Sequence, residues 1–219
     1  MRKGVDFGYF VRVEETDGTI HCVGIYTDFL REMYIDAPDY AEIQVTSNFS
    51  FMRAASHPEE LVTQAAAFGY RAIGIADRNS LSGLVRAHVE AKKVGIPLLV
   101  GSRIDLKDGA SMLAYPENRL AYGRLSKLIT LGRRRSPKGE CELYREDILE
   151  HATGMVLVSI PPRGCDVEFE VELAALNAAI PGSVYLAASH SLRGDDDAHL
   201  DWLSKVATRA GVPMVATND

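Results

Sequence analysis

Short apolar runs alternate with amphipathic segments along most of this chain. The apolar runs have strand length, and the segments between them repeat apolar residues at the spacing of a helix face. We expect strands at 42–47, 72–76, 97–101, 110–115, 155–160, 184–188 and 212–217. We expect one helix to begin at 57–60, and we expect further helices at 81–94, 118–131, 145–152, 167–179 and 196–210. Helices acting as crossovers between short apolar strands favour an α/β fold with a parallel sheet, open or closed into a barrel.

Local signals mark the ends of three of these helices. Ser56 is a candidate N-cap, and Pro58 would occupy the first turn, where a missing N–H costs nothing. Gly69 and Gly95 follow the apolar stripes and are expected to end their helices. The three aspartates at 195–197 directly precede a helix, where carboxylates interact favourably with the helix dipole, so capping is preferred over a metal patch.

The first 39 residues differ from the rest in pattern. Thr16, Asp17 and Gly18 separate two alternating runs, which predicts a β-hairpin. A lone hairpin is marginally stable, so we expect it to pack on the remaining chain or to pair with another strand. The break falls near Asp36–Asp39, and it divides the chain into an extension, 1–39, and a main domain, 40–219.

Composition is that of a globular protein, with 47% apolar and 25% charged residues in a chain of 219. A net charge of −6 argues against a stand-alone nucleic-acid binder. The local exception is the basic run at 133–138, which we interpret as a solvated loop, with a phosphate contact as the alternative. No stretch reaches the length of a membrane span, so no membrane association is expected.

The cysteines Cys22, Cys141 and Cys165 are odd in number and widely spaced. They form neither a disulfide framework nor a zinc-binding pattern. Free cysteines of this kind favour a reducing compartment, so a cytoplasmic location is expected.

Six ordered segments resemble the PHP (polymerase and histidinol phosphatase) domain, at 41–61, 72–83, 100–106, 122–128, 154–156 and 211–219. More narrowly, they resemble the PHP domain of the bacterial C-family DNA polymerase III alpha-type subunits, in their error-prone, damage-tolerance branch. The resemblance implies a distorted seven-stranded β/α barrel with a metal cluster at the carboxyl ends of its strands. It also implies a parent DNA-directed DNA polymerase that uses Mg²⁺ in a separate domain.

Several positions of the implied metal cluster carry residues that bind metals poorly. Gln44 and Thr46 stand where the family has two histidines, and an amide and a hydroxyl are weak ligands for zinc-like ions. Arg78 stands for another histidine and Arg103 for a glutamate, and arginine, always protonated, cannot ligate a cation. The vestigial positions implied by the resemblance are Gln44, Thr46, Asn48, Arg78, Arg103 and Asp219. Ser111 and Pro161 lie near further ligand positions.

The resemblance therefore implies a PHP domain with no metal and no catalytic residue, acting as a structural scaffold. Its partners would be the remaining polymerase domains, DNA indirectly, and damage-tolerance accessory proteins. We expect Arg78 and Arg103 to take the place of the lost cation by pairing with Asp77, Asp105 or Asp219, although both could instead reach solvent.

Three alternatives remain open at this point. Arg78, Arg103 and His190 could form an anion-binding or residual polar site. Asp77, His190 and Asp219 could form an unorthodox Zn²⁺ or Mn²⁺ cluster for phosphoesterase or proofreading nuclease activity. The chain could also be a stand-alone interaction module, with 1–39 supplying a pairing strand. Similar domains continue beyond the position of residue 219, and the sequence leaves open whether this is a natural end.

Overall fold

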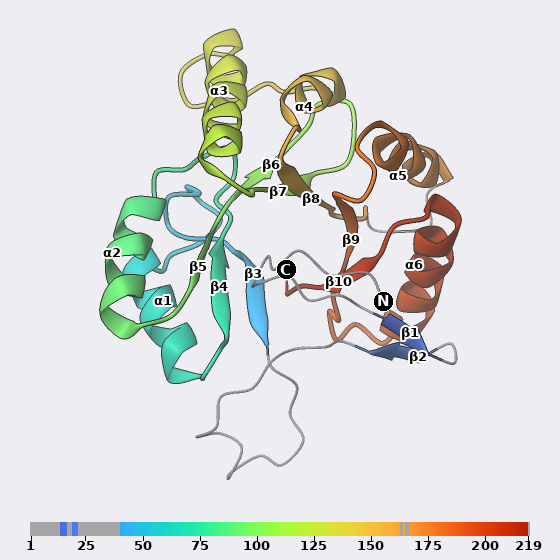
Figure 1. Ribbon diagram of the computed structural model, residues 1–219, viewed down its shortest axis with the longest axis horizontal. Coiled ribbons are helices and arrows are strands. Elements are labelled where there is room, and N and C mark those ends of the chain that lie inside the picture. The colour runs from blue at the N-terminus through green and yellow to red at the C-terminus, as the bar shows by residue number, and fades with distance from the viewer. Residues whose placement is uncertain (1–13, 17–18, 22–39, 163, 165–166, 219) are drawn as a thin grey trace.

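The computed structural model describes residues 14–16, 19–21, 40–162, 164 and 167–218. Eight strands of the main domain form two sheets (Figure 1). The first sheet is parallel and contains β3 (Ala41–Val45), β4 (Ala72–Ile75) and β5 (Leu98–Val100). The second has the order β10-β9-β8-β7-β6. Its members are β6 (Ser102–Ile104), β7 (Met112–Pro116), β8 (Met155–Ser159), β9 (Val184–Ala188) and β10 (Met214–Ala216).

Helices cover the outside of both sheets in three pairs (Figure 1). The pair α1 (Pro58–Ala67) and α2 (Leu84–Val94) shares an apolar cluster with the first sheet. The pair α3 (Arg119–Arg135) and α4 (Arg145–His151) packs over β6, β7 and β8. The pair α5 (Val167–Ala179) and α6 (Asp196–Ala210) packs over β9 and β10. Each helix pair thus buries apolar residues against strands, as the periodicity predicts, although α5 leaves Val167 and Val171 exposed.

A fourth apolar cluster lies inside the ring of strands and joins the two sheets. It includes Ile43 of β3, Leu113 and Tyr115 of β7, and Val215 of β10. The Tyr115 hydroxyl donates a hydrogen bond to the Ile43 carbonyl, and complete burial raises the pKa of this phenol far above its ordinary value. The strands therefore surround a common interior, which puts their carboxyl ends around one mouth.

The two sheets remain separate in their hydrogen-bonded ladders. Over the described residues, no ladder joins β3 to β10, so closure into a complete barrel is not seen in the strand pairing. A side chain spans that gap instead, because the Glu42 carboxylate accepts a hydrogen bond from the backbone N–H of Asn218, just beyond β10.

The arrangement confirms most expected elements and corrects several. The sheet is mixed rather than parallel, because β6, β7 and β8 pair antiparallel. The pattern missed β6. The N-cap of α1 is His57 rather than Ser56, and its backbone N–H donates to the Glu60 carboxylate at 2.8 Å. Gly69 and Gly95 lie at helix ends with positive φ, as expected.

The basic run at 133–138 begins inside a helix rather than in a loop. Arg133, Arg134 and Arg135 form the last turn of α3. Arg135 donates two hydrogen bonds to the Asp147 carboxylate, at 2.7 and 3.0 Å, which ties α3 to α4. Positive charge at a helix C-terminus is favoured by the helix dipole. The prediction of a solvated loop is therefore wrong for these three residues.

The expected hairpin is present where the structure describes it. The strands β1 (Glu14–Thr16) and β2 (Thr19–His21) pair antiparallel, with Thr16 facing Thr19. The remainder of 1–39, including the break at 36–39 and Cys22, lies outside the described residues, as does Cys165. Among the described helices, none is long and apolar enough to cross a membrane.

Candidate functional site

The segment that follows β4 runs alongside β6 at the mouth of the ring. Arg78 and Arg103 form an isolated parallel bridge. The Arg103 N–H donates to the Asp77 carbonyl at 3.1 Å, and the Asn79 N–H donates to the Arg103 carbonyl at 2.8 Å. These backbone bonds hold the two arginines next to each other, although they lie 25 residues apart in the sequence.

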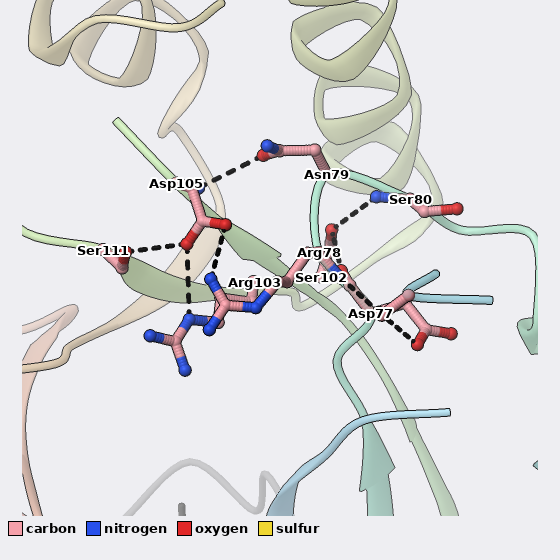
Figure 2. Close-up of polar contacts among 9 residues, drawn as sticks. Asp77, Arg78, Asn79, Ser80, Ser102, Arg103, Asp105 and Ser111 are labelled. Atoms are coloured by element: carbon pink, nitrogen blue, oxygen red, sulfur yellow. Dashed lines mark hydrogen bonds and ion pairs between the residues drawn. The ribbon is translucent and has the colours of Figure 1, made fainter. Parts of the chain in front are cut away.

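Asp105 is the shared partner of both arginines (Figure 2). Its carboxylate accepts from Arg78 Nη1 at 2.7 Å, from Arg103 Nε at 3.3 Å and from the Ser111 hydroxyl at 2.7 Å. Burial alone would raise the pKa of Asp105, but the hydrogen bonds from Ser111 and Arg78 and the charges of both arginines together lower it below its ordinary value. Asp105 therefore stays ionised and neutralises part of the arginine charge.

Asp77 plays a different part from the one expected. Its side chain is buried and accepts from the Ser47 N–H at 2.8 Å, the Ser47 hydroxyl at 2.7 Å and the Ser50 hydroxyl at 2.7 Å. These bonds fasten the loop between β3 and α1 to the end of β4. The partners of the Asp77 carboxylate among the described residues are therefore serines, and of the three carboxylates expected as possible partners of the arginines, Asp105 is the one that the structure describes in a pair with them.

A cleft of about 480 Å³ opens at the carboxyl ends of β3, β4 and β6. Gln44 and Thr46 line it, together with Arg53, Arg78 and Arg103. The Gln44 side chain is buried, and neither its amide nitrogen nor its carbonyl oxygen has a hydrogen-bond partner among the described residues. The cleft occupies the place where the resemblance puts the metal cluster, and it is lined by guanidinium groups.

Glu42 is the carboxylate in the lining of this cleft, and it is already engaged. It accepts from the Tyr40 hydroxyl and from the backbone N–H groups of Gln44 and Asn218. Burial raises its pKa above the ordinary value despite these hydrogen bonds. Its role is to connect β3 with the segment after β10.

The remaining sequence-predicted positions are dispersed. The Asn48 amide nitrogen bonds to Nδ1 of His57 at 2.8 Å, away from the arginines. The Nδ1 atom of His190 lies 3.9 Å from the carboxylate of Asp196, the first residue of α6, which accepts hydrogen bonds from the Ser191 and Arg193 N–H groups of the preceding loop. Asp219 lies outside the described residues. The recorded contacts of Asp77 and His190 thus do not include each other.

Sequence reasoning missed several residues of the cleft, and Arg53 is the charged one among them that is not already paired with the backbone or another side chain in the described residues. It follows the polar turn after β3, and its role depends on the fold of that loop, so no spacing signal could have found it. Asp105 appeared in the sequence only as one of three possible partners for the arginines. In the structure Asp105 is the partner of the arginines, because Ile104 pairs with Met112 at the end of β6 and the next residue lies at the mouth.

The donor set does not fit a Zn²⁺ or Mn²⁺ cluster. Catalytic zinc sites need three histidine, cysteine or carboxylate ligands, and manganese prefers carboxylate oxygens. Over the part of the chain that the structure describes, no group of three or more such residues could hold a metal ion. Two arginines in the same cleft would repel a divalent ion.

Comparison with known proteins agrees with this architecture. The PHP domain matches residues 42–207, and the chain belongs to the PHP domain family. It is 48% identical over 183 residues to the error-prone DNA polymerase of Caulobacter vibrioides, a match covering 83% of this chain and 17% of that protein. It is 42% identical over 185 residues to error-prone DNA polymerase 1 of Agrobacterium fabrum, a match covering 84% of this chain and 17% of that protein. The chain thus matches the PHP region of such polymerases and spans about a sixth of their length.

Solved structures share the fold at low sequence identity. A protein described as a metal-dependent phosphoesterase from Bifidobacterium adolescentis superposes with a TM-score of 0.64 and 18% identity, covering 81% of this chain and 86% of its own. An amidohydrolase from Chromobacterium violaceum, solved with bound sulfate and no metal, superposes with a TM-score of 0.59 and 17% sequence identity. The match covers 82% of this chain and 86% of the amidohydrolase. At this identity the likeness establishes the α/β fold alone.

Proposed function

We propose that this chain is the PHP domain of an error-prone DNA polymerase and acts there as a structural scaffold without a catalytic metal cluster. The observation that carries the proposal is the Arg78–Asp105–Arg103 arrangement in the mouth. A phosphoesterase needs ligands there that hold divalent ions and activate water. This chain instead presents two permanent cations that share one carboxylate.

The loop between β3 and α1 supports the same proposal. In a metal site, an acidic residue at the end of β4 would be available for ligation or for orienting a ligand. Here both oxygens of Asp77 accept hydrogen bonds from Ser47 and Ser50. The polar residues at the mouth hold the backbone in place, which is what a scaffold requires.

Further parts of the proposal concern the parent protein and the complete fold. The parent would be a cytoplasmic DNA-directed DNA polymerase with Mg²⁺ in another domain. The names of the relatives suggest DNA as a partner, and the match to about a sixth of their length suggests the other polymerase domains. Damage-tolerance accessory proteins are proposed as partners from the resemblance alone. The common interior of the two sheets and the Glu42–Asn218 hydrogen bond support a distorted barrel.

Metal content tests the proposal directly. The purified chain is incubated with Zn²⁺ and Mn²⁺, desalted, and measured by elemental analysis, with a parallel sample treated with EDTA as the background. We expect less than about 0.1 equivalents of either metal, since arginines and amides do not retain these ions. About two tightly held ions per chain, as in two-metal phosphoesterases, together with hydrolysis of a phosphate ester, would overturn the proposal.

A further inference from the structure

A second cleft lies beside the mouth, between the β3–α1 loop and the end of α3. Its volume is about 610 Å³. Phe49, Phe51 and Arg53 line one wall, and Arg133 and Lys138 line the other. Arg53 and Arg78 line both this cleft and the mouth, so the two hollows share a basic boundary.

The charge of this cleft contrasts with that of the whole chain. Its lining contains four cationic side chains, those of Arg53, Arg78, Arg133 and Lys138, and one carboxylate, that of Glu140. The chain as a whole carries −6. Within the described residues, the side chains of Arg53 and Lys138 have no hydrogen bond or ion pair. Unpaired cations gathered at a hollow are the electrostatic footprint of a polyanionic partner.

Aromatic and apolar side chains stand exposed at the same edge. Phe51 and Met52 are each 86% exposed, and Phe49 is 37% exposed. Phe49 packs against the guanidinium of Arg86, 5.8 Å from the ring centroid, which in turn pairs with Glu59. Large exposed rings next to free cations distinguish this surface from an ordinary solvated charge cluster.

The loop that carries these rings is held firmly by polar contacts. Ser47 and Ser50 bond to the buried carboxylate of Asp77. The Asn48 N–H donates to the Ser56 carbonyl at 2.9 Å, which closes the loop at its base. The rings are thus presented on a fixed backbone, so a ligand would not need to order the loop on binding.

We propose that this cleft binds a segment of single-stranded DNA, with bases stacking on Phe51 and phosphates contacting Arg53, Arg133 and Lys138. Aromatic platforms beside basic side chains bind single strands in this way without needing a base sequence. A duplex keeps its bases stacked inside and offers only phosphates to the cleft. The choice of DNA over RNA rests on the proposed function, whereas the choice of a single strand rests on the cleft.

Fluorescence anisotropy of the whole 219-residue chain tests the proposal, with a labelled oligothymidylate of about 12 nucleotides, a length within the usual single-strand site size. Phe51→Ala should weaken binding by about 5- to 150-fold, the effect of losing one stacked base. Arg53→Ala and Lys138→Ala should each reduce the slope of log K against log salt by about 0.7, the value for one phosphate contact. A duplex of equal length should bind more weakly.

Matched controls are available on other surfaces. Phe68 is an exposed ring, 59% accessible, and Arg119 is an exposed arginine at the first residue of α3. Phe68→Ala and Arg119→Ala should leave affinity and salt slope unchanged. All five test and control side chains are exposed, and circular dichroism checks that each variant folds.

Three results would overturn the proposal. The first is the absence of oligothymidylate binding at low salt. The second is an unchanged affinity in Phe51→Ala, which would mean that no base stacks on this ring. The exposed ring would then be better explained by a contact with another protein domain. The third is an equal effect of the test and control variants, which would mean diffuse electrostatic binding. None of these results depends on metal content, so failure here is distinguishable from failure of the scaffold proposal.

Discussion

Arg78 and Asp105 meet at 2.7 Å between Nη1 and Oδ2, and they come from the segments that follow β4 and β6. Their side chains are 28% and 30% exposed, so the pair is partly shielded from solvent. The other carboxylate oxygen of Asp105, Oδ1, lies 3.3 Å from Nε of Arg103. One carboxylate thus holds together two cations at the mouth, where the resemblance predicts the metal cluster of the family.

Removal of Arg78 should destabilise the fold. We expect Arg78→Ala to lower the free energy of unfolding by about 1–2 kcal/mol, more than a surface pair and less than a fully buried one. Lys205→Ala, which breaks an exposed pair with Asp201, is the matched control and should cost under about 0.5 kcal/mol. Urea denaturation measures both. Equal stability of Arg78→Ala and the parent chain would exclude a stabilising role for the pair.

The same site should lose its stabilising effect in acid. The pKa of Asp105 is lower in the folded protein than its ordinary value of 3.8. The unfolded chain therefore binds a proton first, and the contribution of Asp105 is complete above that value and is lost as pH falls through the folded pKa. Asp105→Asn should be less stable than the parent chain near neutral pH, and the gap should shrink below about pH 4. A gap that is constant with pH would contradict this assignment.

Glu42 should show the opposite pH dependence. Burial raises its pKa above the ordinary value of 4.5 in the folded state. Its contribution is therefore complete below that value and is lost as pH rises through the folded pKa. In urea titrations between about pH 4.5 and 7, the parent chain should lose stability relative to Glu42→Gln as pH rises. A difference that grows in the other direction would show that hydrogen bonding outweighs burial at this carboxylate.

Asp77 should be the most sensitive polar position of the loop. Replacement by alanine leaves the Ser47 N–H and the Ser47 and Ser50 hydroxyls without their acceptor. We expect Asp77→Ala to cost about 3 kcal/mol and Ser50→Ala about 1 kcal/mol, because buried bonds to a charged acceptor are the stronger ones. Thermal and urea unfolding give both values. Similar small losses in the two variants would mean that the carboxylate does not organise the loop.

Two glycines offer a steric test of the interior. A Cβ on Gly101 would overlap the ring of Tyr115, whereas a Cβ on Gly123, within α3, would meet nothing within 4 Å. Gly101→Ala should destabilise by about 1–3 kcal/mol through overpacking. Gly123→Ala should stabilise by about 0.5–1 kcal/mol through helix propensity. A neutral Gly101→Ala would show that the Tyr115 ring can move aside, and hence that the interior is loosely packed.

Local pattern was enough to locate most elements. The helices at 167–179 and 196–210 and the strand at 184–188 agree with the structure at both ends, because apolar periodicity and flanking turn residues act within the segment itself. The strand at 102–104 escaped notice because it is only three residues long and has Arg103 at its centre. A short polar-centred strand is identified by its pairing with a neighbour, which no local signal encodes.

The direction of the strands and the partners of the charges also depended on distant segments. The short connection between β6 and β7 reverses the chain, so that β7 pairs antiparallel with β6. The sheet is therefore mixed, whereas a parallel sheet was expected. Arg135 was expected in a solvated loop, yet it is drawn to Asp147 by the packing of α4 on α3. Asp77 was a candidate partner for arginines until the folded loop supplied two serines.

By itself, the sequence indicated the family and the order of most strands and helices, because residue identity and short-range spacing carry that information. The resemblance predicts in addition that Gln44, Thr46, Arg78 and Arg103 stand at metal-ligand positions of the family. Only the tertiary structure decided that Asp105 would hold both arginines, that Asp77 would hold the loop, and that Phe51 and Lys138 would border one cleft. Ion pairs and clefts form between segments far apart in the chain, so their geometry follows from packing rather than from sequence pattern.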